Sequence, residues 1–400
     1  MKRILFVDDE PRILDGLQRM LRSRRNEWET EFAVGGGQAL VRMAAAPFDV
    51  IVTDMRMPEM DGAELLQIVH DRYPSTIRII LSGQTDTEAT LRTLGLAHQF
   101  LLKPCDQAVL AEVIDRVCAL QGLLNDAALI SIVGGVECLP TTPALYARLT
   151  AAVADPSASL TRIVAIVERD AAISAKVLQL VNSAFFGLSN HLTSLDSAIS
   201  YLGFSVVRAI VLSQEVFHGF GLPSFRGALD LETEQTHAVM VANAARRIGA
   251  EIGQADEAFV AGMLHDVGKL ILALRMPEHL AALHQEGQLS QSPMHVVELR
   301  HGPITHAEVG AYLLGLWGLP YHIVEAVAHH HAPGRVPASR LDLIGAVHVA
   351  DSLVREARGA KGAESGCLDL AYIEKAGLVE ALPRWREMVT DQVRAHAAAA

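Results

Sequence analysis

Acidic, hydroxyl and basic side chains follow apolar runs in the N-terminal third, where the strands of a parallel sheet would end. Asp8 and Asp9 follow the first run, Asp54 the third, Ser82 the fourth and Lys103 the fifth. Because the carboxyl ends of parallel strands meet at one edge of a sheet, we expect these side chains to converge. Clustered carboxylates imply a hard cation such as Mg²⁺. With phosphoryl oxygens held by Mg²⁺ and Lys103, an aspartate could form an acyl phosphate.

A simpler interpretation is that these residues cap the helices that follow the strands, as acids and hydroxyls often do. Any one of them alone would more often be a cap than a ligand. Here a paired carboxylate, a single carboxylate, a hydroxyl and a lysine all stand in strand order. That combination favours the ligand interpretation.

The segments that must position these residues alternate between short apolar runs and amphipathic stretches up to about residue 122. This alternation predicts a doubly wound α/β domain with a parallel sheet. The expected strands are Ile4–Val7, Thr30–Ala33, Asp49–Thr53, Ile77–Leu81 and Gln99–Leu102. The expected helices are Arg12–Leu21, Gln38–Ala45, Ala63–Asp71, Glu88–Leu94 and Ala108–Leu120.

Four segments at these strand ends resemble the motifs of response-regulator receiver domains. They are Val-Asp-Asp-Glu at 7–10, Val-Thr-Asp-Met-Arg-Met-Pro-Glu-Met-Asp-Gly at 52–62, Leu-Ser-Gly at 81–83 and Leu-Lys-Pro at 102–104. The resemblance implies a flavodoxin-like (βα)5 fold in which Asp54 accepts a phosphoryl group. The other residues that it implies are the Mg²⁺ ligands Asp8, Asp9, Asp54 and the backbone carbonyl of Arg56, and the phosphoryl-sensing residues Ser82, Lys103 and Phe100.

Histidines and aspartates form a second candidate constellation in the rest of the chain. Its members are His237, His265, Asp266, His306, His330, His331 and Asp351. Imidazole and carboxylate together suit Fe, Mn, Ni or Zn, and such a set could hold one or two metals that activate water for phosphoester hydrolysis. The alternative is that these are core histidines with satisfied hydrogen bonds, or cations at helix ends. For His329 alone we favour that structural interpretation, and we expect Lys269 and Arg335 to be solvated surface cations.

Helical periodicity dominates after Gly134-Gly135 and predicts an all-α second part. Examples are Leu160–Leu180, Ser205–Glu215, His237–Ile248 and Ala307–Leu314. We therefore place the first domain at residues 1–122 and the helical domain at 123–400. Within the helical domain we expect an N-terminal bundle at 125–225, a second bundle around the histidines at 232–355 and a C-terminal helical tail at 356–400.

Several segments of the helical part resemble the HDOD domain, a relative of the HD-GYP phosphodiesterases. They are Leu139-Pro140, Asp155-Pro156, Asp170-Ala171-Ala172, the segment 181–188 (Val-Asn-Ser-Ala-Phe-Phe-Gly-Leu), Ala198-Ile199 with 201–203, the segment 264–270 (Leu-His-Asp-Val-Gly-Lys-Leu), 306–310 and 317–320. The resemblance implies a module that has generally lost catalysis and serves as output. The chain departs from the HD-GYP pattern after His330-His331, where neither an acidic residue nor Gly-Tyr-Pro follows.

Composition narrows the class of protein. Thirty-four Lys and Arg against 46 Asp and Glu give a net charge of −12, which disfavours direct DNA binding. The N-terminal apolar run is too short for a signal peptide, and no apolar run approaches the length of a membrane span, so we expect a cytoplasmic location without membrane attachment. Four cysteines without Cys-x-x-Cys pairing do not form a disulfide framework.

These observations favour a phosphorylation-controlled signalling protein of a two-component system. A sensor histidine kinase would supply the phosphoryl group, and the helical domain would be a non-enzymatic output module for a downstream protein partner that the sequence does not identify. The alternative is a metal-dependent phosphohydrolase or cyclic-dinucleotide phosphodiesterase in the helical domain. A homodimer is a fair expectation, since receiver domains commonly pair.

Overall fold

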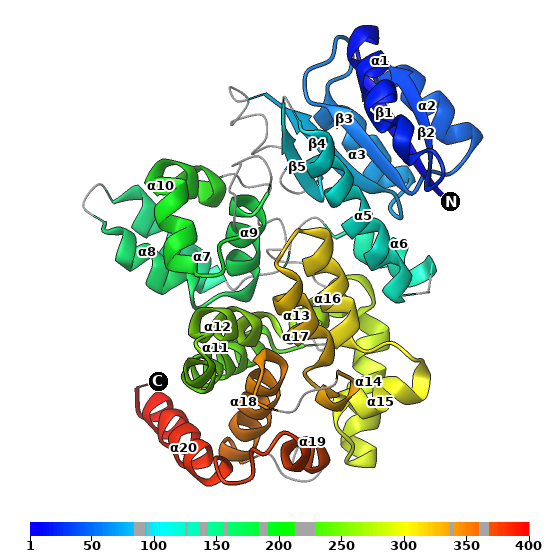
Figure 1. The fold of residues 1–400 in the computed structure, drawn as a ribbon. Helices are drawn as coiled ribbons and strands as arrows, with labels where there is room; N and C mark the ends of the chain where they lie inside the picture. The colour runs from blue at the N-terminus through cyan, green and yellow to red at the C-terminus, as the bar shows by residue number, and fades with distance from the viewer. Residues whose placement is uncertain are drawn as a thin grey trace.

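A computed structural model describes residues 1–83, 93, 96–103, 105–124, 127–136, 139, 143–155, 158–183, 191–212, 229–336, 340–359 and 368–399. It places an α/β domain at the N-terminus, which continues through α5 (Gln107–Leu124) and α6 (Ala127–Gly134) into a helical region (Figure 1). This architecture confirms the predicted fold class. Within these ranges, no helix combines the length and the apolar character needed to cross a membrane.

The α/β domain is built on one parallel five-stranded sheet in the order β2-β1-β3-β4-β5. The strands are β1 (Lys2–Asp8), β2 (Trp28–Val34), β3 (Val50–Asp54), β4 (Ile77–Ser82) and β5 (Gln99–Leu102). Strands β3 and β4 are buried along their whole length, as expected of strands with helices over both faces. The helices besides α5 are α1 (Pro11–Met20), the 3-10 helix η1 (Leu21–Arg24), α2 (Gly35–Ala45) and α3 (Gly62–Arg72).

The predicted strands all exist, and their bounds differ from the observed ones by no more than two residues. The agreement arises because near-continuous apolar runs bounded by polar residues are the sequence pattern of buried parallel strands. The predicted helix Glu88–Leu94 lies outside the described residues, apart from Thr93.

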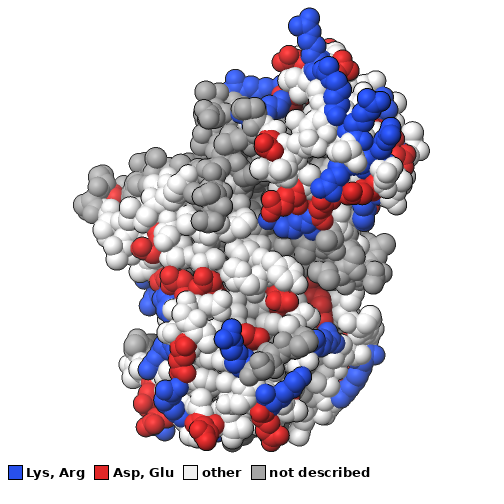
Figure 2. Space-filling view, in the orientation of Figure 1, with Lys and Arg blue, Asp and Glu red and all other residues white. Residues whose placement is uncertain are grey.

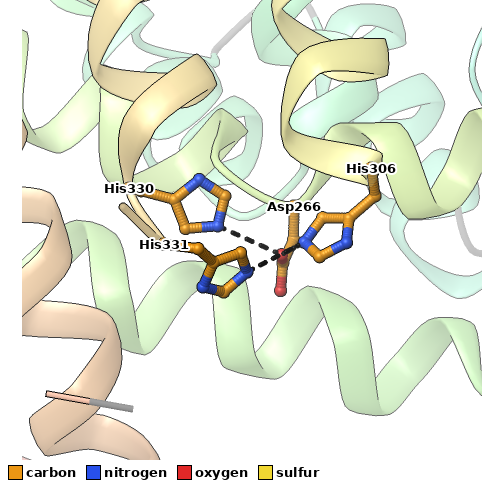
Figure 3. Close-up of side chains that lie close together, drawn as sticks. All are labelled: Asp266, His306, His330 and His331. Carbon is orange, nitrogen blue, oxygen red and sulfur yellow. Dashed lines mark hydrogen bonds and ion pairs between the residues drawn. The ribbon is translucent and has the colours of Figure 1, made fainter. Parts of the chain in front are cut away.

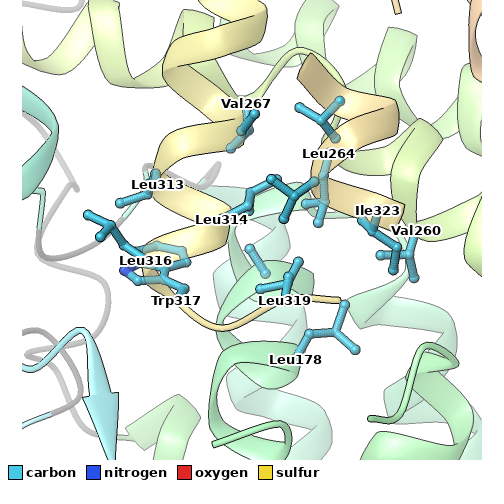
Figure 4. Close-up of a cluster of buried hydrophobic side chains, with 14 of the residues drawn as sticks. Leu178, Val260, Leu264, Val267, Leu313, Leu314, Leu316, Trp317, Leu319 and Ile323 are labelled. Carbon is cyan, nitrogen blue, oxygen red and sulfur yellow. The ribbon is translucent and has the colours of Figure 1, made fainter. Parts of the chain in front are cut away.

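The helical region surrounds α16 (His306–Leu316), whose leucines are buried. Leu313, Leu314 and Leu316 pack with apolar side chains from neighbouring helices (Figure 4). The other helical elements are α7 (Pro143–Ala154), α8 (Leu160–Val167), α9 (Ala171–Val181), α10 (Leu195–Leu212), α11 (Leu231–Gly249), η4 (Ala250–Ile252), α12 (Ala255–Leu264), α13 (Val267–Arg275), α14 (Pro277–Ser290), α15 (Met294–His301), α17 (Tyr321–His329), η5 (Pro333–Arg335), α18 (Leu343–Ala357), α19 (Leu370–Lys375) and α20 (Leu382–Ala399).

The segment Leu160–Leu180 is not one helical stretch, as its periodicity suggested, but two helices divided at Asp170. The Asp170 backbone is extended, and its Oδ1 accepts the N–H of Ile173 at 2.9 Å as the N-cap of α9. Its Oδ2 accepts a hydrogen bond from Gln235 of α11 at 2.7 Å. An N-cap carboxylate satisfies the free N–H groups of a new helix, so apolar spacing alone could not reveal the break.

Asp170 should make stability depend on pH. Burial raises its pKa to about 7, so between about pH 4 and pH 7 the folded chain holds a proton that the unfolded chain has lost. Its contribution to stability is therefore complete below about pH 4 and disappears as the pH rises through about 7. Relative to Asp170→Asn, we expect the wild type to lose about 3 kcal/mol between about pH 5 and pH 8 in denaturant unfolding. An unchanged difference between the two proteins would contradict this.

The two domains meet where β5 faces the C-terminal end of α16. Gln99 Nε2 donates a hydrogen bond of 2.6 Å to the carbonyl oxygen of Leu316. Gln179 of α9 approaches the carbonyl oxygen of His98 at 3.5 Å. Gly318 has a φ of +78°, and a Cβ there would lie 2.7 Å from the Gln99 amide nitrogen. The left-handed backbone at position 318 therefore favours glycine, and a larger residue there would push against the Gln99 amide.

A second junction surrounds Arg78, which is completely buried in β4. Its guanidinium donates to the carbonyl oxygens of Leu96 at 2.6 Å and of Gly134, in α6, at 2.8 Å. The ring of His98 accepts the backbone N–H of Arg78 at 3.0 Å, and burial together with the Arg78 charge lowers the pKa of His98 well below its usual value. The buried Arg78 guanidinium is thus hydrogen-bonded to carbonyl oxygens of the α/β domain and of α6, and these bonds hold α6 against the sheet.

Candidate functional site

The carboxyl ends of β1, β3 and β5 bring Asp8, Asp54 and Lys103 together. Lys103 Nζ lies 2.7 Å from Asp8 Oδ2 and 2.5 Å from Asp54 Oδ1. Burial raises the pKa of Asp54, although the Lys103 charge opposes the shift. Burial alone would lower the pKa of Lys103, but its hydrogen bonds to Asp54 and Asp8 raise it. The ammonium group thus pairs with two carboxylates at the edge of the sheet and offsets one of their two negative charges.

The remaining predicted residues of this site lie in register with the first three. Asp54 pairs with Leu81 in the sheet, so Ser82 is one position beyond it, and Ser82 in turn pairs with Leu102. Ser82 and Phe100 are completely buried. The other two predicted Mg²⁺ ligands flank the carboxylates: Asp9 is half-buried beside Asp8, and the backbone N–H of Arg56 donates to Asp54 Oδ2 at 3.1 Å. This oxygen-rich donor set fits Mg²⁺.

The loop after Asp54 owes its shape to Asp61 and Gly62. Asp61 caps α3 through a reciprocal pair of hydrogen bonds with Glu64. A Cβ on Gly62 would overlap the carbonyl oxygen of Asp54 and lie 3.0 Å from Met55 Cα. The glycine thus lets α3 start directly against the end of β3, which carries Asp54.

The histidines and aspartates predicted in the second part form one buried His–Asp cluster. Its first half consists of Asp266, His306, His330 and His331, and its second half of His237, His265 and Asp351; the ligand atoms within each half lie within 4.8 Å of one another. The four side chains of the first half point toward one another (Figure 3). Asp266 joins the halves, with Oδ1 3.0 Å from His306 Nε2 and Oδ2 3.2 Å from His265 Nε2.

Three rings of the cluster are oriented by a hydrogen bond from Nδ1. His265 Nδ1 donates to the Gly262 carbonyl, His330 Nδ1 to the Val327 carbonyl and His306 Nδ1 to a Glu298 carboxylate oxygen, each at 2.7 Å. In the neutral form of each ring Nδ1 therefore carries the proton, and Nε2 is then available as a ligand atom facing the cluster. His265 Nε2, His330 Nε2 and Asp266 Oδ1 are buried without a hydrogen-bond partner. Orphaned buried donor atoms of this kind fit a metal ion.

The charges of the carboxylates control protonation in the cluster. Burial disfavours protonated histidine, but the Asp266 charge raises the pKa of His265 to about 10, and the Glu298 charge raises that of His306 to about 9. Burial and neighbouring histidines lower the pKa of His330 and His331 well below the usual value. The two aspartates have strongly lowered pKa values, against the effect of burial, because cations surround them.

Lys269 is not a solvated surface cation, as we had expected, but is 4% exposed within this cluster. Its Nζ donates to Asp266 Oδ2 at 2.6 Å. Arg355, which the sequence did not single out, donates through Nε to Asp351 Oδ1 at 2.8 Å and through a terminal nitrogen to Asp266 Oδ2 at 3.1 Å. Arg335 is half-exposed and pairs with Glu308 at 3.0 Å, consistent with the predicted surface role.

Two cavities are lined by residues of the His–Asp cluster. One of about 540 Å³ is lined by His306 and His331 of the first half, with His295 stacked on the His331 ring at 4.1 Å. The other, of about 330 Å³, is lined by His237 of the second half. Both are also lined by Lys269 and Arg355. An anionic ligand would meet these two cations in either cavity and Arg358 as a third in the smaller one, beside the Glu234 carboxylate that lines both.

Asn182, from the segment 181–188, has a local structural role. Its side-chain amide donates to the Leu192 carbonyl at 2.8 Å, and its carbonyl accepts the Leu192 N–H at 2.7 Å. Phe185 and Phe186 lie outside the described residues.

Comparison with known families matches both parts of the chain. The family model described as "Response regulator receiver domain" matches residues 4–115, and that described as "HDOD domain" matches residues 139–333. An uncharacterized protein of Treponema pallidum is 26% identical over 272 residues, and the response regulator protein PilR of Pseudomonas aeruginosa is 36% identical over 115 residues. The alignments cover 66% and 28% of this chain, and 52% and 25% of those relatives.

The chain therefore spans about half the length of the Treponema protein and a quarter of that of PilR. Among solved structures, the MmoQ response regulator of Methylococcus capsulatus aligns with a TM-score of 0.49 and 22% identity. That alignment covers 62% of this chain and 98% of the MmoQ chain.

Proposed function

Because the chain carries a response regulator receiver domain followed by a C-terminal HDOD domain, we propose that a phosphoryl group on Asp54 controls a binding surface of the HDOD domain. Mg²⁺ bound by Asp8, Asp9, Asp54 and the Arg56 carbonyl would neutralise the incoming phosphoryl oxygens. Asp54 would be the nucleophile, and a histidine kinase the donor. A downstream protein would recognise the HDOD surface, and the helical domain would begin near residue 123.

The hydrogen bond between Gln99 and Leu316 carries this proposal. Gln99 is adjacent in β5 to Phe100, one of the predicted phosphoryl-sensing residues, and lies four positions before Lys103. Its partner ends α16, the helix that begins with His306 of the His–Asp cluster. A change in β5 on phosphorylation would therefore act directly on the central helix of the HDOD domain.

A protein partner suits the surface of this domain better than a nucleic acid. On the visible face of the described helical region, acidic and basic side chains are interspersed (Figure 2). Nucleic-acid binding would need a basic surface strong enough to overcome the net charge of −12.

Gln99→Ala should change how tightly the receiver binds beryllofluoride with Mg²⁺, a stable mimic of the phosphoryl group. If the Gln99–Leu316 contact is stronger in one state of the receiver than in the other, removing it shifts the balance between the two states. By thermodynamic linkage, the affinity for a ligand that selects one of these states then changes as well. We expect the dissociation constant, measured by calorimetry, to change about fivefold or more. Gln107→Ala is the control, because Gln107 is exposed and bonds only within the receiver, to Ser23 at 3.3 Å. Equal affinities in all three proteins would show that the contact does not couple the domains.

A second candidate function, metal-dependent phosphoester hydrolysis, is supported by the orphaned donor atoms of the His–Asp cluster. Fe, Mn, Ni or Zn bound there would supply Lewis-acid activation of water. The chain itself would orient His265, His306 and His330 through their Nδ1 hydrogen bonds. Lys269 and Arg355 would attract an anionic ester. The missing acidic and Gly-Tyr-Pro elements still favour the output module.

Glu298→Gln should weaken metal binding without removing a ligand. Glu298 accepts a hydrogen bond from His306 Nδ1 at 2.7 Å, and its negative charge makes Nε2 of that ring a stronger metal ligand. We expect about a 10- to 100-fold loss of Mn²⁺ or Zn²⁺ affinity in competition with a chelator. Glu286→Gln is the matched control, because Glu286 also pairs with a histidine, His301 at 2.7 Å, but on the surface. Equal losses in both variants would exclude the proposed orientation of His306.

A further inference from the structure

We propose that the His–Asp cluster holds a single metal ion, in its first half, because the Arg355 guanidinium already serves as the second cation between Asp351 and Asp266. This inference rests on the proposed metal binding of the cluster. The inference adds which half of the cluster binds metal and how many metal ions the helical domain holds.

Two ligand atoms of the first half lack a hydrogen bond. Asp266 Oδ1 and His330 Nε2 are buried without one, although Asp266 Oδ1 lies 3.0 Å from His306 Nε2. His331 Nε2 and His306 Nε2 are hydrogen-bonded to each other at 3.1 Å, a contact that an ion between them would replace. The larger cavity, of about 540 Å³, is lined by His306 and His331 and gives an ion access to this half. A cation here would satisfy atoms that the protein leaves unpaired.

Two carboxylate oxygens beside the second half already accept two hydrogen bonds each. Asp351 Oδ1 accepts hydrogen bonds from His237 Nε2 and Arg355 Nε, each at 2.8 Å. Asp266 Oδ2 accepts from Lys269 Nζ at 2.6 Å and from Arg355 at 3.1 Å. A carboxylate oxygen offers about two lone-pair sites. A metal bound through either of these oxygens would therefore have to displace one of their donors, even though His265 Nε2 lies there without a hydrogen bond.

The stoichiometry of bound metal tests this inference. The full-length protein is loaded with excess Mn²⁺, stripped of weakly bound ions including receiver Mg²⁺ by gel filtration, and examined by elemental analysis and electron paramagnetic resonance. We expect about one Mn²⁺ per chain with the spectrum of an isolated ion, and about two with an exchange-coupled spectrum in Arg355→Met. Arg355→Lys keeps the positive charge and should remain at about one. Two coupled ions in the wild type would overturn the proposal.

Single-ligand variants identify the half that is used, and they answer the question even if Arg355→Met does not fold. His237→Ala, in the second half, should retain about one Mn²⁺, whereas His306→Ala, in the first half, should retain none. Loss of the ion from His237→Ala with retention in His306→Ala would overturn the assignment. Absence of tightly bound metal from the wild type would overturn the proposed metal binding itself, and this inference with it. Circular dichroism establishes that each variant is folded.

Discussion

Asp54→Asn is expected to abolish phosphoryl uptake from acetyl phosphate, with labelling reduced by about 100-fold or more. An amide cannot attack phosphorus to form the acyl phosphate, while its size keeps the strand end intact. Asp8 is 2% exposed and also contacts Lys103, but in the proposed function it binds the cation and does not receive the phosphoryl group. Phosphoprotein gel analysis or intact mass measures the uptake.

Asp15→Asn is the matched control for that variant. Asp15 is an exposed acid of α1 that is not among the predicted site residues, and its replacement should leave labelling unchanged. Labelling of Asp54→Asn at the wild-type level would show that the phosphoacceptor lies elsewhere. Loss of labelling in both variants would point to a general effect of removing negative charge.

Gly268→Ala is expected to destabilise the helical domain by about 3 kcal/mol or more and to disrupt the His–Asp cluster. A Cβ on Gly268 would overlap the carbonyl oxygen of His306 and lie 2.9 Å from the backbone nitrogen of Gly310. Both obstacles are backbone atoms of α16, so α13 and α16 would have to separate. Asp266 and His306 lie on opposite sides of that contact, and their distance of 3.0 Å would increase.

Thermal unfolding of the metal-free protein and of the Mn²⁺-loaded protein measures both effects. Gly302→Ala is the matched control, since Gly302 has an extended backbone and a Cβ there would meet nothing within 4 Å. We expect that variant to unfold like the wild type. If Gly268→Ala were as stable as Gly302→Ala and bound metal equally well, the described contact of α13 with α16 would be wrong.

The α/β domain was predictable because its information is local. Each strand is an apolar run, and the parallel topology then places Asp8, Asp54 and Lys103 at one edge without knowledge of any side-chain contact. The bounds of the strands were correct to within two residues for the same reason.

The surroundings of the His–Asp cluster were not predictable in that way. Its ligands could be proposed because histidine and aspartate are themselves unusual in apolar helices, but their partners are ordinary charged residues. Arg355 reaches Asp266 across 89 positions of sequence, and Glu298 meets His306 from a different helix. The one sequence signal for Arg355 is its i,i+4 spacing from Asp351 on α18. Lys269 was misplaced because long cations are usually exposed unless paired.

The contacts between the domains could not be predicted from the sequence pattern either. The apolar neighbours of Gln99 in its strand predict that it is buried. They do not predict that its amide bonds to Leu316, which is 217 positions away in the sequence. Nothing in the spacing of glutamine residues identifies such a partner. The break at Asp170 was hidden in the same manner, because its hydrogen bond to Gln235 depends on the packing of α9 against another helix.

Hydrogen–deuterium exchange of the full chain, with and without beryllofluoride and Mg²⁺, tests most directly whether Asp54 controls the HDOD domain. If it does, amides of α16 (His306–Leu316) and α9 (Ala171–Val181) will change their exchange rates in the wild type and not in Asp54→Asn. Changes confined to the receiver, with α16 and α9 unaltered, would contradict the proposed control of the output domain.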